Sequence, residues 1–444
     1  MTVEKIKKNF LASMVVFFVA IPLCLGIALA SGASLFSGII TGCIGGVVVG
    51  LISASRVSVS GPAAGMVAVV LTTVDQLGNY DAFLLALLFA GILQIIGGAL
   101  RGGFIANYVP ATVVKGLLAA IGLTIVIKQI PLAVGYLGGP FSLDEMLKTA
   151  QENGVISSIP HLLTHVNIGA TLISILSFMV LFFWDKICFQ KIKIMPSAII
   201  VVILGVIVNL LYEHFWPSLL LESRHLVNIP VANNLQDFLS QFNHPDFSAF
   251  TNEKVYFYGV MIAIVASLET LLNLEAIEKI DKQHRYCSRN RELIAQGVGN
   301  ICSSLVGGLP ITSVIVRSSV NINAGANDKL STILHGLLLL ISLTFMARWL
   351  NYIPIAALAT ILIYTGLKLA KLSLFIEVYQ KGPRYFIPFI VTIIAILWFN
   401  LLFGILIGLA TSILFILQRN SKNCFSVVDE QHPSGEVLRL VLPQ

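Results

Sequence analysis

Residues 307–322 read GGLPITSVIVRSSVNI and place one arginine, Arg317, in a stretch of apolar and small residues. An arginine at membrane depth costs about 2.5 to 3.5 kcal/mol on insertion scales, so it needs a partner or a function. Its planar guanidinium presents a fixed fork of donors, which suits an oxyanion. The stretch therefore predicts an anion site. Snorkelling to a headgroup and a static pair with a buried carboxylate are the alternatives.

The residues before Arg317 predict a helix that begins inside the membrane. Pro310 ends the preceding element, and Thr312 or Ser313 can cap a helix that opens at VIVRSSV. The free backbone N–H groups of Val314 and Ile315 would then point into the membrane interior.

A second stretch, SVSGPAAG at 58–65, has the same form. The residues expected to cap and open its helix are Ser60, Gly61, Pro62, Ala63 and Ala64. Two helix N-termini aimed at one point supply partial positive charge and unpaired donors without a mobile cation. Together with Arg317 they predict a site for a small anion.

The apolar stretch VYFYGVMIAIVASLETLLNLEAIEKI, at 255–280, places Glu269 near its middle and Asn273 one turn later on the same face. Glu275 lies nearer the end, where a carboxylate is more easily hydrated. Burial and a nearby arginine act in opposite senses on the protonation of a carboxyl group, so Glu269 could exchange protons as the site changes hydration. Proton coupling is our hypothesis for Glu269, and a fixed counter-charge for Arg317 is the alternative.

The composition sets the class of protein. Of 444 residues, 57% are apolar and 11% are charged, whereas an ordinary soluble domain carries about 25% charged residues. Apolar segments of membrane-spanning length recur from end to end, which predicts an all-α polytopic membrane protein in the lipid bilayer. The formal charge of +6 is spread over short loops, so it indicates membrane topology and no nucleic-acid partner.

Sequence motifs for catalysis are absent. The chain contains no HExxH, GxSxG or Walker motif, so we expect a transporter that is neither an enzyme nor an ATP-driven pump, and no cofactor. His161 and His165 have helical metal-ligand spacing without a third ligand nearby, so we expect no metal site. The N-terminus imitates a secretory signal, but another span follows at once, and we expect a first transmembrane helix instead.

We place about fourteen spans along the chain. They lie near 9–31, 35–54, 61–78, 82–101, 108–128, 167–184, 197–215, 255–277, 291–306, 313–323, 330–349, 352–368, 384–400 and 401–418. With the N-terminus inside, the loops after even-numbered spans are the basic ones, which predicts cytoplasmic N- and C-termini in the cytoplasmic membrane. Their basic residues are Lys186, Lys191, Lys193, Lys279, Lys282, Arg285, Arg289, Arg291, Lys368, Lys371, Lys381 and Arg384.

Two of these spans, the third and the tenth, are short half-helices, and each follows an extended peptide that ends in proline and small residues. Interrupted segments in both halves of a chain indicate an inverted-repeat transporter with its site near the midplane. We take 9–215 as the first repeat and 255–418 as the second. Both interruptions should face one cavity, because broken backbone at membrane depth must be buried in protein or line a cavity.

The chain resembles the sulfate permease (SulP) family of anion transporters. The resemblance rests on AIPLCLGIALASGA in the first span, SVSGPAAG in the third, and NRELIAQGVGNICSSLVGGLPITSVIVRSSVNINAGA across the ninth and tenth. It covers 9–418 and implies two inverted repeats of seven spans, arranged as a core (gate) domain and a scaffold domain. It also implies a homodimer and an elevator-like movement of the core domain with the anion.

The resemblance also assigns site residues. Carried over to this chain, they are the backbones of Ala63, Ala64, Val314 and Ile315, the Arg317 side chain, and Leu23 and Ile27 as pocket-lining positions. Glu269 matches the acidic position of the eighth span. The same resemblance implies that sodium-coupled bicarbonate members have an aspartate at this position, a threonine one turn later and no arginine in the tenth helix. Here the pattern is Glu269, Asn273 and Arg317, which puts sodium coupling in doubt.

The C-terminal end departs from the family pattern. Most members continue into a cytoplasmic STAS domain. We take 1–420 as the transporter domain and 421–444 as a short cytoplasmic tail, in which EVLRLVLPQ at 436–444 resembles the first strand of a truncated STAS domain.

The sequence thus predicts a secondary active transporter of a small inorganic anion, with sulfate and bicarbonate as the chief candidates. Proton symport or anion exchange would drive it. Sodium-coupled bicarbonate uptake and exchange of chloride or another anion are the alternatives within the family. A nucleobase permease would bring acidic side chains from the eighth and tenth spans, and the tenth offers an arginine instead. A voltage-responsive membrane protein without substrate flux is the rival of another class.

Overall fold

The structure is a computed structural model. It describes residues 3–104, 110–136, 166–184, 196–232, 234–281, 283, 285–399, 401–422, 426–432 and 435–441. His161 and His165, and the predicted loop lysines Lys186, Lys191, Lys193 and Lys282, lie outside the described residues.

The chain divides into two compact units. The first comprises Met1–Tyr108 and Ile121–Ala370, and the second comprises Val109–Ala120 and Lys371–Gln444. The first unit draws on both predicted repeats, because helices from the two halves of the chain pack against each other within it.

The first unit is helical, and the two predicted interruptions form its strands. Its longer helices are α1 (Val3–Ala30), α2 (Leu35–Ile44), α4 (Val67–Leu77), α5 (Tyr80–Ala99), α9 (Ile168–Phe183), α10 (Ser197–Phe215), α12 (Glu253–Ile280), α13 (Arg289–Leu305), α14 (Ile315–Asn323), α15 (Leu330–Phe345) and α17 (Ile355–Leu369). Its short elements are α3 (Gly50–Ile52), α11 (Leu235–Leu239), α16 (Ala347–Leu350), β1 (Ser60–Pro62) and β2 (Ile311–Ser313). Helix α6 (Ala111–Ala133) begins in the second unit and ends in the first.

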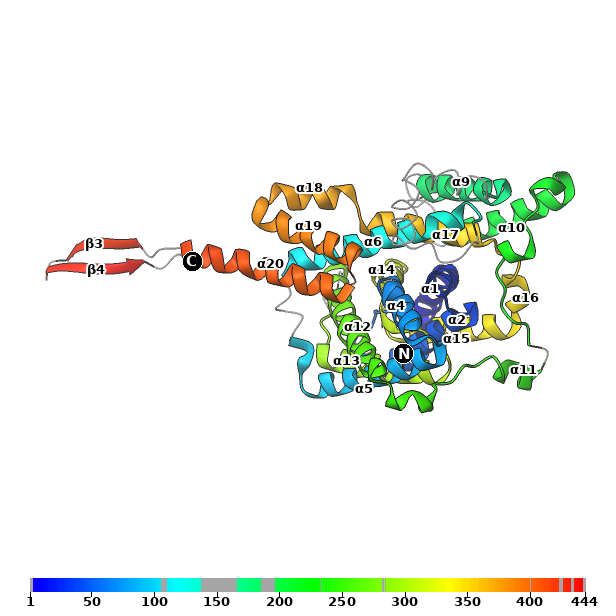
Figure 1. Cartoon of the computed structure of the whole chain (residues 1–444), viewed down its shortest axis with the longest axis horizontal. Helices are drawn as coiled ribbons and strands as arrows, with labels where there is room; N and C mark the ends of the chain where they lie inside the picture. The colour runs from blue at the N-terminus through cyan, green and yellow to red at the C-terminus, as the bar shows by residue number, and fades with distance from the viewer. Residues whose placement is uncertain are drawn as a thin grey trace. The chain divides into compact units, whose positions relative to one another are not determined.

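The second unit contains α18 (Leu372–Gln380), α19 (Pro383–Trp398), α20 (Leu401–Lys422) and a hairpin of β3 (Ser426–His432) and β4 (Gly435–Val441). Helices α19 and α20 lie side by side (Figure 1). The strand predicted at 436–444 corresponds to β4, and its partner β3 was not predicted. Each of the fourteen predicted spans overlaps a helix of the structure.

Seven of the described helical segments are long and apolar enough to cross a membrane. They are Glu4–Ala30, Leu35–Ile52, Tyr80–Ala99, Ala111–Ala133, Ser197–Phe215, Glu253–Ile280 and Ile355–Gln380. Helix α13, with 17 residues, is not among them, and it buries polar side chains that include Glu292, Gln296 and Asn300. The chain is therefore a polytopic α-helical membrane protein. Some of its other helices, such as α13, pack polar side chains inside the protein.

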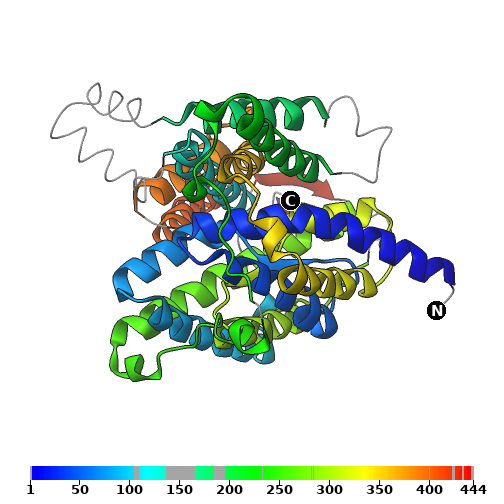
Figure 2. The ribbon, with the colours of Figure 1, turned by 90° about the vertical axis from the view of Figure 1, so that its right-hand side faces the viewer.

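Helix α1, in dark blue in Figure 2, is a single long helix, and it packs against α2, α14, α15 and β1. Helices α5 and α13 form the most extensive helix pair of the first unit. Glycines allow this approach: a Cβ on Gly91 would lie 2.7 Å from the carbonyl oxygen of Gly297. These contacts surround the two strands with tightly packed helices.

The second predicted span is not one continuous α-helix. Between α2 and α3, residues Gly45–Val49 form a π-helical stretch. A Cβ on Gly45 would lie 2.5 Å from the carbonyl oxygen of Ser60 in β1, and one on Gly46 would lie 2.6 Å from the Cα atom of Gly336 in α15. Glycines here therefore let β1 and α15 reach the helix backbone, and π-helical turns of this kind are frequent at functional sites.

Candidate functional site

The two interrupted stretches meet in a small antiparallel sheet. Strand β1 pairs with β2, with Gly61 opposite Thr312. All residues of both strands are buried. Because the strands are antiparallel, the chain leaves the pair at opposite ends, and each following helix directs its N-terminus back toward the pair. The shared location of the two interruptions is as the sequence predicted.

The helices begin later than predicted, and the predicted caps are wrong. Ser60, Gly61, Pro62, Thr312 and Ser313 pair as strands instead of capping helices, because the strand pairing extends to both ends of the interruptions. After β1, the N-cap is Ala63, and a 3₁₀ turn over Ala64–Met66 leads into α4. After β2, the N-cap is Val314, and α14 begins at Ile315. Neither N-cap side chain makes a capping hydrogen bond.

The backbone N–H of Val314 is not free, which corrects a second expectation. It donates to the carbonyl oxygen of Val59 at 3.0 Å. The Ser318 hydroxyl strengthens this junction, since it accepts from the Val59 N–H at 2.9 Å and donates to the Val314 carbonyl at 2.7 Å. The N–H groups of the first helical turn have no partner within their own helix, so Ile315 remains the candidate donor to an anion.

Arg317 lies directly on the strand pair. A Cβ on Gly61 would collide with its Nη1 atom, so the guanidinium rests on the backbone of β1. Gly42 of α2 faces the same nitrogen. Cys24 of α1 and His335 of α15 are close enough for the arginine charge to act on them. The positive charge is therefore enclosed by β1 and three helices.

This charge has no partner in the described part of the protein. Arg317 has no exposed surface, and its three guanidinium nitrogens make no hydrogen bond of good geometry, even to the neighbouring Cys24 thiol. Both ring nitrogens of His335 are likewise buried and unpaired among the described residues. These observations contradict snorkelling and a static carboxylate pair. A buried cation without a partner is costly, so the site favours an anion.

Glu269 lies at the start of the helix that follows β1, and among the described residues its carboxylate makes no hydrogen bond with Arg317. A Cβ on Gly65 would be 2.6 Å from Glu269 Oε1, and the Gly65 N–H is directed at the carboxylate. Its Oε2 atom is buried without a hydrogen-bond partner among the described residues. The alternative of a fixed counter-charge for Arg317 is therefore not supported. The carboxylate instead occupies the positive end of the short helix that leads into α4.

Asn273 has a structural contact in addition to its predicted place beside Glu269. Its Nδ2 atom donates to the carbonyl oxygen of Ser313 at 2.5 Å. Thr270, on the same face of α12, accepts from the Ser313 N–H at 3.4 Å. Helix α12 thus places Glu269 at the start of the helix that follows β1. Its Asn273 and Thr270 bind Ser313, the last residue of β2.

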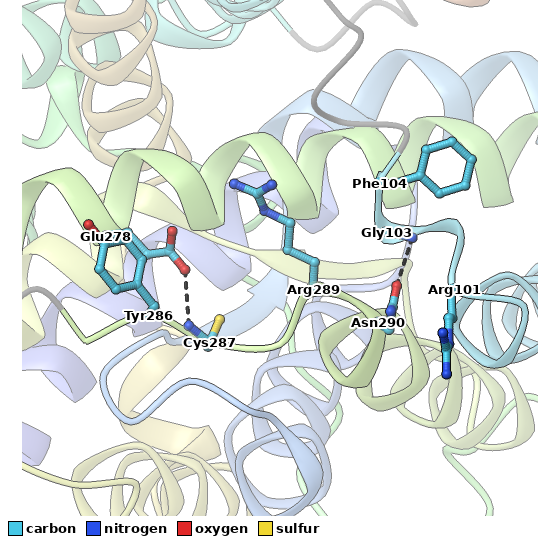
Figure 3. Close-up of a pocket in the computed structure, with 8 residues that line it drawn as sticks. All are labelled: Arg101, Gly103, Phe104, Glu278, Tyr286, Cys287, Arg289 and Asn290. Atoms are coloured by element: carbon cyan, nitrogen blue, oxygen red, sulfur yellow. Dashed lines mark hydrogen bonds between the residues drawn. The ribbon is translucent and has the colours of Figure 1, made fainter.

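Leu23 and Ile27 are buried on α1, which packs against β1 and α14. Their helix therefore borders the candidate site, and the assignment of these two side chains to the anion pocket stays a prediction. Two cavities lie elsewhere, one lined by residues that include Arg101 and Asn290 (Figure 3) and the other by residues that include Val15 and Asp281, and neither is lined by the predicted site residues.

Sequence reasoning missed a polar stripe on α13 that supports both strands. Gln296 Nε2 donates to Ser60 Oγ at 2.8 Å, which anchors β1. Asn300 Oδ1 accepts from the Ile311 N–H at 2.6 Å, which anchors β2. One turn earlier, Glu292 accepts from Gln296. The signal was present in NRELIAQGVGN, where polar residues recur every four positions on one helix face.

Replacing Asn300 with leucine should destabilise the site. The change removes three hydrogen bonds, to the Ile311 N–H and carbonyl and to Gln94. Leaving buried polar groups unpaired costs about 1–3 kcal/mol each, so we expect a clearly lower Tm in detergent. Cys302→Val, on the same helix and only half-buried, is the control. Equal Tm values for the two variants would contradict an anchoring role.

Comparison with known proteins places this geometry in a family. A family model described as the sulfate permease family matches residues 6–392. YvdB of Bacillus subtilis, which is named as a sulfate transporter, is 26% identical over 97% of this chain and 77% of its own length. The bicarbonate transporter BicA of Picosynechococcus is 23% identical over 86% of this chain and 65% of its own length.

Solved structures show the same fold. The transmembrane domain of a cyanobacterial bicarbonate transporter, BicA, superposes with a TM-score of 0.73 at 20% identity, over 93% of this chain and 98% of that one. The structure of SLC26A9 superposes with a TM-score of 0.80 at 18% identity, over 99% of this chain and 69% of that one. The inverted-repeat fold predicted from the two interruptions is thereby confirmed.

Proposed function

Because the chain belongs to the sulfate permease family of anion transporters, we propose that it moves a small inorganic oxyanion, sulfate or bicarbonate, by secondary active transport. The anion binds between the N-termini of the two half-helices and beside Arg317. Proton symport or anion exchange drives its accumulation across the cytoplasmic membrane.

The observation that carries this proposal is the unpaired charge of Arg317 on the β1–β2 pair. The Ile315 N–H at the start of α14 and the buried guanidinium of Arg317, whose nitrogens have no partner among the described residues, would supply donors and positive charge to an anion beside the strand pair. Such groups replace the water of an anion without needing to reorganise. An oxyanion uses several of these donors at once, which favours it over chloride.

Transport by an elevator-like movement is part of the proposal. The strand pair is tied to α12 through Ser313 and to α13 through Ser60 and Ile311. These bonds make the site move with its helices as one body. Spin-label distances between α13 and α10 should shift when an anion gradient is imposed, and unchanged distances would contradict the movement.

Chemical cross-linking in liposomes tests the proposed homodimer.

Radiolabelled sulfate and bicarbonate uptake into proteoliposomes tests the function. We expect uptake of at least one of the two anions, stimulated by an inward proton gradient or by a trapped exchange anion. Stimulation by a sodium gradient alone would favour the sodium-coupled alternative. No uptake of either anion under any gradient would refute the proposal.

A further inference from the structure

Helix α15 carries a buried histidine, His335, near the candidate anion site. Its side chain has no exposed surface, and neither ring nitrogen has a hydrogen-bond partner among the described residues. A buried polar atom without a partner costs free energy, because it has given up its hydrogen bonds to water. The three guanidinium nitrogens of Arg317 are in the same condition. Both side chains therefore call for a ligand that can pair with them.

Close packing brings the His335 segment of α15 to the strand pair. A Cβ on Gly46, in the π-helical stretch, would lie 2.6 Å from the Cα atom of Gly336. One turn before His335, Thr332 Oγ1 donates at 3.3 Å to the carbonyl oxygen of Ser58, which lies two residues before β1. The turn of α15 that carries His335 is therefore fixed against the residues that lead into β1.

The guanidinium of Arg317 lies at the same level of α15. A Cβ on Gly42 would lie 2.8 Å from Leu339 Cδ1 and 3.9 Å from Arg317 Nη1. Leu339 follows His335 by one turn on the same buried face, because residues four apart are neighbours on a helix. The charge of Arg317 also acts on the imidazole. His335 therefore lies beside the cation that is proposed to hold the anion.

A neutral imidazole adds an acceptor to a site that otherwise offers donors. The Arg317 side chain and the Ile315 N–H can only donate, whereas the neutral ring of histidine has one donor nitrogen and one acceptor nitrogen. Bicarbonate has one O–H group, which needs an acceptor, and sulfate has none. The two candidate anions therefore differ in the group that His335 could recognise.

The charge of the site also favours a monoanion. Arg317 supplies one buried positive charge, which balances bicarbonate. Sulfate carries two negative charges, so one of them would remain without a partner beside Arg317, and a buried unpaired charge is costly. The hydrogen-bonding groups and the charge thus select the same anion.

We propose that neutral His335 is a ligand of the transported anion, and that it accepts the O–H of bicarbonate and so selects bicarbonate over anions without a proton to donate. This assignment rests on the proposed transport function and narrows its substrate. Either ring nitrogen can serve as the acceptor, since the tautomer adjusts to the partners that the ring finds.

Formate is the probe that isolates the O–H group, because it is bicarbonate with a hydrogen atom in place of that group. Binding of bicarbonate, formate and sulfate to the full chain in detergent is measured by calorimetry under mildly alkaline conditions, where bicarbonate predominates over carbonic acid. The wild type should bind bicarbonate at least about tenfold more tightly than formate or sulfate, since one hydrogen bond to a buried group changes affinity by about that factor.

His335→Phe keeps a ring of similar size and removes both nitrogens. It should bind bicarbonate about tenfold more weakly than the wild type and bind formate equally well. His335→Gln restores a donor and an acceptor and should keep most of the preference for bicarbonate. His214→Phe, the same change at an exposed position of α10, is the control and should match the wild type for all three anions.

The outcomes distinguish this assignment from the proposed transport function. If His335→Phe binds bicarbonate as tightly as the wild type, while the wild type takes up sulfate or bicarbonate in proteoliposomes, the assignment is wrong and the transport function stands. An equal loss for bicarbonate and formate would indicate a structural role of the ring and would also overturn the assignment, as would tighter binding of sulfate than of bicarbonate by the wild type. If the wild type neither binds nor takes up either anion, both proposals fail.

Discussion

Arg317→Gln should lower anion uptake by at least about 30-fold. The wild-type guanidinium is fully buried on the strand pair and has no hydrogen-bond partner in the described part of the protein. Leaving a buried charge unpaired costs about 2–5 kcal/mol, and an anion bound beside Arg317 avoids this cost. Since each 1.4 kcal/mol is a factor of ten, the loss should appear as a much higher KM for the transported anion in proteoliposomes.

Arg317→Lys separates two ways in which the arginine could act. If Arg317 acts through its charge, the lysine variant should keep most of the uptake. If it acts through the planar fork of donors, lysine should lose nearly as much as glutamine does. All three guanidinium nitrogens are without a hydrogen-bond partner among the described residues, so the fork is available to the proposed oxyanion, and we expect the second result.

Stability measurements distinguish a loss of anion binding by Arg317→Gln from a loss of folding. Removing a buried charge that has no partner should not destabilise the protein, so Arg317→Gln should keep or raise the Tm. Arg224→Gln removes an equal charge from a side chain that is 67% exposed and should transport normally. Wild-type uptake by Arg317→Gln would refute a role for this arginine in anion binding.

Glu269→Gln should abolish proton-driven accumulation of the anion. The wild-type carboxylate lies against Gly65, at the helix start where the anion is proposed to bind. A negative carboxylate there repels the anion, and a protonated one does not, so proton and anion should bind together. Wild-type uptake should therefore rise as the external pH falls. The glutamine variant is neutral at every pH, and its uptake should be independent of pH between about 5.5 and 8.

Glu275→Gln is the matched control for this experiment. Glu275 is on the same helix, is 42% exposed and pairs with Lys279 at 2.7 Å. Its replacement should leave both uptake and pH dependence unchanged, because water already solvates the carboxylate. If Glu269→Gln keeps the full pH dependence of the wild type, proton coupling through Glu269 is wrong. Exchange of anions without a proton gradient should survive in Glu269→Gln.

Local patterns were sufficient to predict the spans of this protein and their two interruptions. The fourteen spans follow from hydropathy, which depends on neighbouring residues alone, and each overlaps a helix. The two interruptions could be recognised in the sequence because proline and glycine disfavour a continuous helix at their own positions. Their shared location at one site followed from the requirement that broken backbone in a membrane be buried.

Details of the site were less predictable. The sequence placed caps at Thr312 and Ser313 because hydroxyl side chains commonly cap helices, and it left the Val314 N–H free. The structure instead pairs these residues with the other half of the chain. The bond between Ser58 and Ser313 joins residues 255 positions apart, and no local propensity reveals such a partner. The π-helical turn at Gly45–Val49 has the same cause, since it accommodates β1.

The sequence by itself determined that this protein is a polytopic membrane protein with two broken helices and a buried positive charge, because composition, hydropathy and breaker residues are local properties. Only the tertiary structure decided the register of β1 with β2, the placement of Glu269 at Gly65 instead of Arg317, and the support from α13. These features depend on which residues, distant in the sequence, are in contact in the fold. The tertiary packing of the whole unit determines those contacts.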